Sequence, residues 1–103
     1  MLQYQTIEDA INNCKVEYTA FIVGVKEKEV TIVKLEENRW YLKIPLDGNS
    51  VEKKIIDSGF SKEECGFHSD YRKNGMLIRV NKNYITVHGK ITQGMDLLEE
   101  IMK

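Results

Sequence analysis

Residues Val16–Ile44, VEYTAFIVGVKEKEVTIVKLEENRWYLKI, decide the fold prediction, and we expect the rest of the chain to pack around them. Branched and aromatic residues dominate this stretch, and such side chains fit the pleated surface of a β-sheet. Two short polar clusters, Lys26–Glu29 and Glu36–Arg39, interrupt it. Each cluster has the length and polarity of a hairpin connection, so the stretch predicts a three-stranded antiparallel meander.

The pairing of these strands decides which side chains share a face, because a slip of one residue turns every side chain over. We expect Val25 to pair with Val30, and Leu35 to pair with Trp40. On that register the core face holds Ala20, Ile22, Val33, Leu35, Trp40, Leu42 and Ile44. The opposite face holds Phe21, Val23, Val25, Val30 and Ile32, followed by Lys34, Tyr41 and Lys43.

The second face of this predicted meander is apolar at one end, whereas a solvated sheet face normally alternates apolar and polar residues. A helix of the same chain that covers the apolar end would explain the pattern. The other explanation is an interface for self-association or for a partner protein, since exposed apolar surface usually marks such sites. The partner-binding hypothesis assigns this interface to Phe21, Val23, Val25, Val30, Ile32 and Tyr41.

Capping patterns predict short helices on both sides of the meander. Thr6 and Asp9 resemble a capping box, and apolar residues follow at helical spacing. These residues are Ile7, Ala10, Ile11 and Cys14. A second helix is expected to begin at Asn49 and to end at Gly59, which has the position of a terminating glycine. Its buried side would consist of Val51, Ile55 and Ile56.

The remaining residues predict a third short helix, a loop, a hairpin and a final helix. Residues Ser61–Gly66 have the pattern of a short helix or turn, and residues 67–75 that of a polar connection. Met76–Ile91 alternates as a hairpin does, with Lys82 in its turn, and we expect Val80 to face Ile85 and Ile78 to face Val87. Gln93–Lys103 carries a helical apolar stripe.

The predicted order is therefore α-β-β-β-α-α-β-β-α. All connections are short, which favours antiparallel pairing and the α+β class. We expect one small α+β domain, residues 1–103, built from a three-stranded antiparallel meander and a C-terminal β-hairpin with short helices. The final helix is the leading candidate to cover the second face of the meander.

Composition excludes several classes of protein. The chain has 103 residues, of which 42% are hydrophobic and 30% charged, as in ordinary globular proteins. Its net charge of −1 predicts no strong field for nucleic acid or anionic membranes. The first residues lack the basic and apolar regions of a signal peptide, and no apolar run has membrane-spanning length. We therefore expect a cytoplasmic protein with Cys14 and Cys65 reduced.

The hairpin and the residues before it form the clearest candidate binding surface. From Tyr71 to Met95 the chain contains no Asp or Glu. The candidate binding residues in or near this hairpin are Arg72, Lys73, Arg79, Lys82, Tyr84, His88 and Lys90. Basic side chains between aromatic ones suit single-stranded nucleic acid or an acidic partner protein. An ordinary solvated hairpin face has the same composition, and no known nucleic-acid-binding motif is present.

Signals for chemistry are weaker. Cys65 and His68 have the spacing of metal ligands, but the only other Cys and His, Cys14 and His88, are distant in the sequence. His68, Asp70 and Tyr71 are a conceivable acid–base group, with Cys65 as nucleophile, although nothing in the sequence brings them into one pocket. No phosphate-binding loop or catalytic motif is present. We therefore predict no enzyme, no metal site and no cofactor.

The leading hypothesis is a small non-enzymatic binding protein that contacts a partner protein, as an inhibitor or adaptor does, and that self-associates as a homodimer. The first alternative is a nucleic-acid-binding module that uses residues 71–91. The second alternative is a small-ligand binder with its site between subunits, which would leave no motif in the sequence. No membrane partner is expected.

Overall fold

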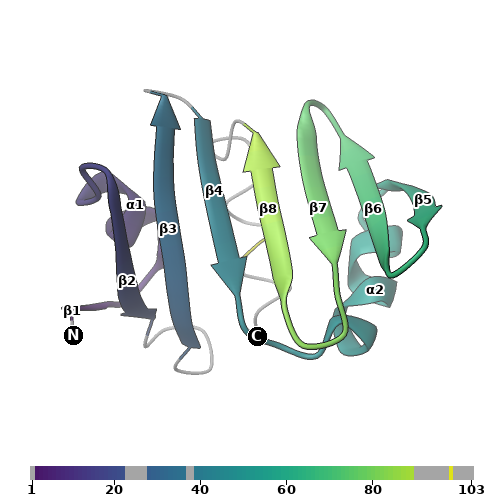
Figure 1. Ribbon diagram of the computed structural model, residues 1–103, viewed down its shortest axis with the longest axis horizontal. Helices are drawn as coiled ribbons and strands as arrows, with labels where there is room; N and C mark the ends of the chain where they lie inside the picture. Colours follow the sequence, from purple (N-terminus) through teal and green to yellow (C-terminus); the bar gives the residue numbers. More distant parts are fainter. Residues whose placement is uncertain (1, 23–27, 37–38, 90–97, 99–103) are drawn as a thin grey trace.

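A computed structural model describes residues 2–22, 28–36, 39–89 and 98, without the side chains of Lys28, Leu35 and Glu36. Within these residues, eight strands form one sheet in the order β1-β2-β3-β4-β8-β7-β6-β5 (Figure 1). The strands are β1 (Leu2–Tyr4), β2 (Glu17–Ile22), β3 (Lys28–Glu36), β4 (Arg39–Ile44), β5 (Ser61–Cys65), β6 (His68–Lys73), β7 (Met76–Val80) and β8 (Ile85–Gly89). The helices are α1 (Ile7–Asn12) and α2 (Gly48–Asp57).

Two antiparallel meanders make up most of the sheet. Strands β2, β3 and β4 form the first, and strands β5 to β8 form the second. Pairing of β4 with β8 joins them, and the short β1 lies parallel to β2 at one edge. Helix α2 connects β4, the last strand of the first meander, to β5, the outer strand of the second. The second meander then returns towards the first, and its last strand, β8, pairs with β4.

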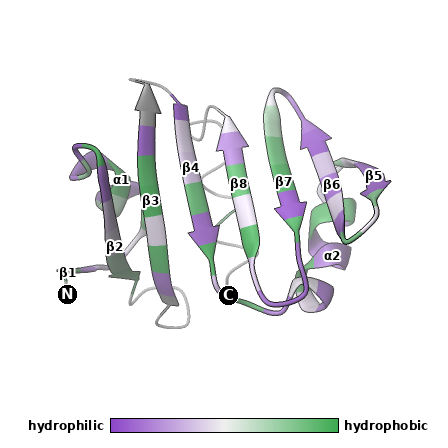
Figure 2. Ribbon diagram, in the orientation of Figure 1, coloured by the Kyte–Doolittle hydropathy of each residue, from purple (hydrophilic) through white to green (hydrophobic). Residues whose placement is uncertain are grey.

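The predicted α+β fold, with a three-stranded meander and a separate hairpin, is wrong. The meander and the hairpin exist, but both belong to one eight-stranded sheet. The short helix or turn predicted for Ser61–Gly66 is instead strand β5, Ser61–Cys65. Most of the polar connection predicted for residues 67–75 is strand β6. Both strands are largely hydrophilic (Figure 2), so neither carries the alternation that normally identifies a strand.

The expected register of the first meander is also wrong. Ala20 pairs with Val30, and Ile32 pairs with Leu42, so Val30 and Ile32 lie on the core face rather than opposite to it. The register of β3 with β4 shifts between Lys34 and Glu36. An extra residue of this kind turns the following side chains over, which explains why a register inferred from the hairpin end fails along the strand.

The hydrophobic core lies on one face of the sheet, beneath both described helices. In Figure 1 the helices lie behind the sheet, α1 near β2 and β3 and α2 near β6. The fully buried strand residues are Ala20, Ile22, Val30, Ile32, Leu42, Ile44, Tyr71, Ile78, Ile85 and Val87. Leu98 is helical and belongs to the same buried cluster, whereas the rest of the predicted helix Gln93–Lys103 lies outside the described residues.

Local sequence explains where the helices begin and end. The Thr6 hydroxyl accepts a hydrogen bond from the Asp9 backbone N–H at 3.1 Å and caps α1, as predicted. Helix α2 is capped by Asp47 rather than by the predicted Asn49. Gly59 follows it with a φ of 92°, the left-handed conformation that ends a helix and that glycine adopts without strain. Neither described helix is long and apolar enough to cross a membrane.

Candidate functional site

The face of the sheet opposite to the core carries the candidate site, and we call it the open face because neither described helix lies over it. The strand register arranges its central side chains in two rows. The first row runs Thr31, Lys43, Thr86, Arg79, Asp70 and Glu63. The second row runs Val33, Tyr41, His88, Leu77, Arg72 and Ser61.

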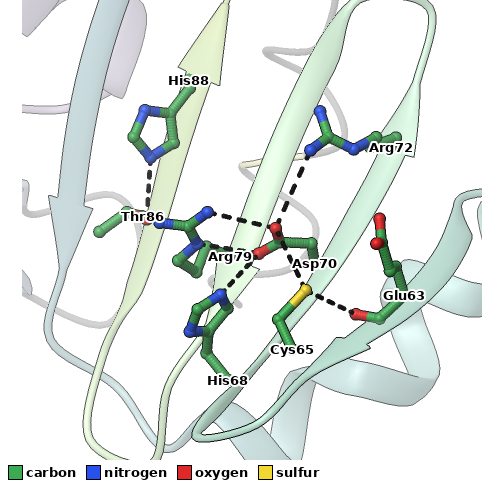
Figure 3. Close-up of polar contacts among 8 residues, drawn as sticks. All are labelled: Glu63, Cys65, His68, Asp70, Arg72, Arg79, Thr86 and His88. Atoms are coloured by element: carbon green, nitrogen blue, oxygen red, sulfur yellow. Dashed lines mark hydrogen bonds and ion pairs between the residues drawn. The ribbon is translucent and has the colours of Figure 1, made fainter.

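Asp70, on β6 next to the edge strand β5, is the centre of a polar cluster on the open face, and its side chain is only 4% exposed. The Arg79 guanidinium donates to both carboxylate oxygens, from Nε at 2.9 Å and from Nη2 at 3.2 Å. Arg72 Nη2 lies 3.9 Å from Oδ2, and His68 Nε2 lies 3.5 Å from Oδ1. The Cys65 thiol lies 3.8 Å from Oδ2, so side chains from β5, β6 and β7 meet at one carboxylate (Figure 3).

These contacts set the charge state of the cluster. The hydrogen bonds from Arg79 lower the pKa of Asp70 from its ordinary value, so Asp70 is an anion at neutral pH. The same hydrogen bonds raise the pKa of Arg79. Burial, together with the Asp70 charge, raises the pKa of the Cys65 thiol. Cys65 is therefore a protonated thiol at neutral pH and lacks the activation that a catalytic nucleophile requires.

The centre of the open face combines aromatic and basic side chains in close contact. The Tyr41 ring and the His88 ring meet edge to face, with centroids 4.9 Å apart. His88 Nε2 lies 3.1 Å from the Thr86 hydroxyl, and burial lowers the pKa of His88. The Lys43 ammonium lies 4.5 Å from the centroid of the Tyr84 ring, within the range of a cation–π interaction.

Only part of the predicted basic surface is brought together. Arg72, Arg79 and His88 lie on the open face, and Tyr84 contacts Lys43 of that face. Lys73 is directed to the opposite side, where its ammonium donates to the Ser58 carbonyl at 2.6 Å. Lys82 lies in the exposed turn between β7 and β8, and Lys90 lies outside the described residues.

The predicted apolar partner surface does not exist as one face. Val30 and Ile32 are fully buried in the core, because the register places them under the helices. Phe21 and Tyr41 are half-buried on the open face, and Val23 and Val25 lie outside the described residues. Val30 and Ile32 are therefore not available for self-association in the folded chain.

The conceivable acid–base group is divided by the alternation of β6. His68 and Asp70 lie on the open face, whereas Tyr71 is fully buried on the core face. The two cysteines are free, with Cys14 in the core and Cys65 on the open face.

The structure adds Asp70 to the pair Cys65 and His68, and the ligand atoms of all three lie within 4.8 Å of one another. The sequence contained the signal for this group. In a strand, residues two apart share a face, so recognising β6 would have placed Asp70 beside His68.

No known protein family, curated protein or solved structure matches the chain.

Proposed function

We propose that this chain is a small non-enzymatic binding protein whose open face contacts an acidic surface of a partner protein. The observation that carries the proposal is the charge of the three strands in the middle of that face, β4, β8 and β7. The open-face side chains of β4, β8 and β7 are Arg39, Tyr41, Lys43, Thr86, His88, Leu77 and Arg79, and none is acidic. Such a surface attracts negative charge and suppresses binding to basic partners.

Several side chains of this face suit a protein interface. Tyr and Arg are enriched among the residues that contribute most to binding between proteins, and the face contains Tyr41, Arg72 and Arg79. The Arg72 side chain is 60% exposed and that of Arg79 is 38% exposed, so both guanidinium groups are accessible to a partner. Asp70 fixes Arg79 in position, which reduces the entropy that Arg79 loses on binding.

Single-stranded nucleic acid is the rival partner, and the ring geometry argues against it. Bases stack on free aromatic faces, but the Tyr41 and His88 rings meet edge to face and Lys43 lies over the Tyr84 ring. Carboxylates also border the basic strands, with Glu63 on β5 at one end and Glu29 on β3 at the other. The basic area is therefore bounded rather than a continuous track for a phosphate backbone.

Two matched variants test the proposal. Lys43→Glu with Arg72→Glu reverses two charges on the open face, and Lys15→Glu with Lys53→Glu makes the same change at exposed positions elsewhere. Tagged wild-type protein is isolated from its native cells after nuclease treatment. Mass spectrometry identifies the proteins that co-purify with it, and the partner is then purified. We expect the partner to be acidic and to bind wild type and the Lys15/Lys53 variant.

The Lys43/Arg72 variant is expected to lose most of this binding, with a faster dissociation rate in a purified two-component assay. Equal binding by both variants would exclude the open face as the interface. A different result would identify nucleic acid as the partner instead. In that case nuclease treatment would abolish the co-purification, and a labelled uridine oligonucleotide would bind with an affinity that falls steeply with salt.

A further inference from the structure

The β5–β6 hairpin assembles a three-ligand group whose thiol and imidazole the proposed binding function does not use. Cys65 and His68 are directly opposite each other across the two strands, and Asp70 follows on the same face of β6. One ligand atom of each residue, a thiol sulfur, an imidazole nitrogen and a carboxylate oxygen, lies within 4.8 Å of the other two. Figure 3 shows the Cys65 and His68 side chains both directed at the Asp70 carboxylate.

The distances are close to those of a zinc site. Zinc binds sulfur at about 2.3 Å and nitrogen or oxygen at about 2.0–2.2 Å, so neighbouring tetrahedral ligand atoms lie about 3.3–3.7 Å apart. The Cys65 sulfur is 3.8 Å from Asp70 Oδ2, and His68 Nε2 is 3.5 Å from Asp70 Oδ1. The two distances go to different oxygens of Asp70, so side-chain rotations must bring the thiol and the imidazole to a common ion. The strand register already places all three side chains on one face.

We propose that Cys65, His68 and Asp70 bind one Zn²⁺ ion and leave its fourth position open to solvent or to a partner. Thiolate, imidazole and carboxylate are the three ligand types that zinc takes from proteins. Three protein ligands with an open fourth position are typical of sites that exchange a ligand, whereas purely structural sites have four protein ligands. The open position would lie on the open face, on which all three residues lie.

Arg79 does not exclude the ion, because a carboxylate has about four lone-pair sites. Arg79 occupies one site on each Asp70 oxygen. The thiol of Cys65 and the ring of His68 lie against the same two oxygens, and a metal ion would replace the protons there. Arg79 then acts as the outer partner that fixes the ligand carboxylate, a role that such partners have in many metal sites.

Two features limit the affinity and give the site a distinctive signature. Arg72, whose Nη2 is 3.9 Å from Asp70, repels a cation. Binding also requires the Cys65 thiol to lose its proton to solvent, so one proton is released for each ion bound. Affinity is therefore expected to rise about tenfold per pH unit while Cys65 remains a thiol in the free protein.

Cobalt provides the direct test, because a Co²⁺–thiolate bond produces a charge-transfer band in the near ultraviolet. We expect the reduced wild-type protein to develop this band with one equivalent of Co²⁺ and to lose it when Zn²⁺ is added. Cys65→Ser should abolish the band, and His68→Gln should weaken Zn²⁺ binding at least about 100-fold, more than loss of an outer partner does. Cys14→Ala and His88→Gln are matched controls and should bind as wild type does.

Isothermal titration in buffers of different ionisation enthalpy should show one proton released per Zn²⁺, and Arg72→Gln should bind more tightly than wild type. Alkylation of the wild-type protein is a second measurement of Zn²⁺ binding, and it does not depend on the folding of any variant. Zn²⁺ should slow iodoacetamide modification of Cys65, and a chelator should restore the rate. Absence of the cobalt band, or Zn²⁺ affinity equal in wild type and Cys65→Ser, would overturn the proposal.

Discussion

The two faces of the sheet can be compared position by position, because consecutive residues of the same strands form a core row and an open row. The core row is Ile32, Leu42, Val87, Ile78 and Tyr71, all of them fully buried. The open row is Thr31, Lys43, Thr86, Arg79 and Asp70. The backbone is shared, so any difference between the rows comes from the side chains and from what covers them.

The comparison separates two kinds of stabilisation. Removal of apolar area from water stabilises the core row, and that contribution depends little on pH or salt. Charged hydrogen bonds to Asp70 stabilise the open row, and that contribution depends on ionisation. Substitutions in the core row should therefore cost stability under all conditions. Those in the open row should cost less, and by an amount that changes with pH.

The largest expected effect comes from a charge placed in the core row. Ile32→Asp should cost about 4 kcal/mol or more and leave the chain largely unfolded, because a buried carboxylate would have no partner. Thr31→Asp, one residue earlier and on the open face near Lys43, should change the free energy of unfolding by less than about 1 kcal/mol. Urea denaturation followed by circular dichroism measures both. Similar losses for the two variants would contradict the assigned faces.

The next effect concerns Asp70, at the β6 end of the open row. Asp70→Asn should cost about 1–2 kcal/mol, because Arg79 loses a charged, bidentate acceptor but remains partly solvated. Glu63→Gln in the same row removes an exposed carboxylate and should change the free energy of unfolding by less than about 0.5 kcal/mol. If both variants were equally stable, Asp70 would not organise the open face.

The pH dependence of this difference sharpens the comparison. Because the folded-state pKa of Asp70 lies below its unfolded value of about 3.9, the Asp70 contribution is present above that pH and is lost as the pH falls through the folded value. The difference between wild type and Asp70→Asn should be constant from about pH 7 to 5 and should shrink below about pH 4. A difference that grew in acid would show that the Asp70 pKa is raised. The Ile32 substitution, in contrast, should be costly throughout.

Sequence predicted the locally determined parts of the fold and missed those set by distant pairing. The Thr6 cap and the pairing of Val80 with Ile85 were predicted and confirmed, since neighbouring residues determine both. Strand β1 has only three residues and owes its structure to β2. Strand β5, SKEEC, is a charged strand at the edge of the sheet. Charges on an edge strand oppose pairing with another chain, but they also remove the alternation of apolar and polar residues by which a strand is recognised in a sequence.

The candidate site was predicted only in fragments for the same reason. Arg79 and His88 were placed on one face because the hairpin register was correct. Asp70, which organises the cluster, was assigned to a loop because β6 contains a single fully buried apolar residue, Tyr71. A strand that buries one apolar side chain gives too weak an alternation to be recognised without knowledge of its neighbours.

The smallest expected effect concerns His88, which lies beside the open row on the same face, at mildly acidic pH. Burial, with Arg79 nearby, lowers the folded-state pKa of His88, so the folded protein favours the neutral ring. As the pH falls through the unfolded value of about 6.5, the unfolded state gains the proton first and wild type loses stability. His88→Gln should not show this loss, and the two should diverge by less than about 1 kcal/mol. Urea denaturation between pH 7.5 and 5 measures the divergence, and parallel curves would mean that the ring is fully solvated, as on an ordinary strand surface.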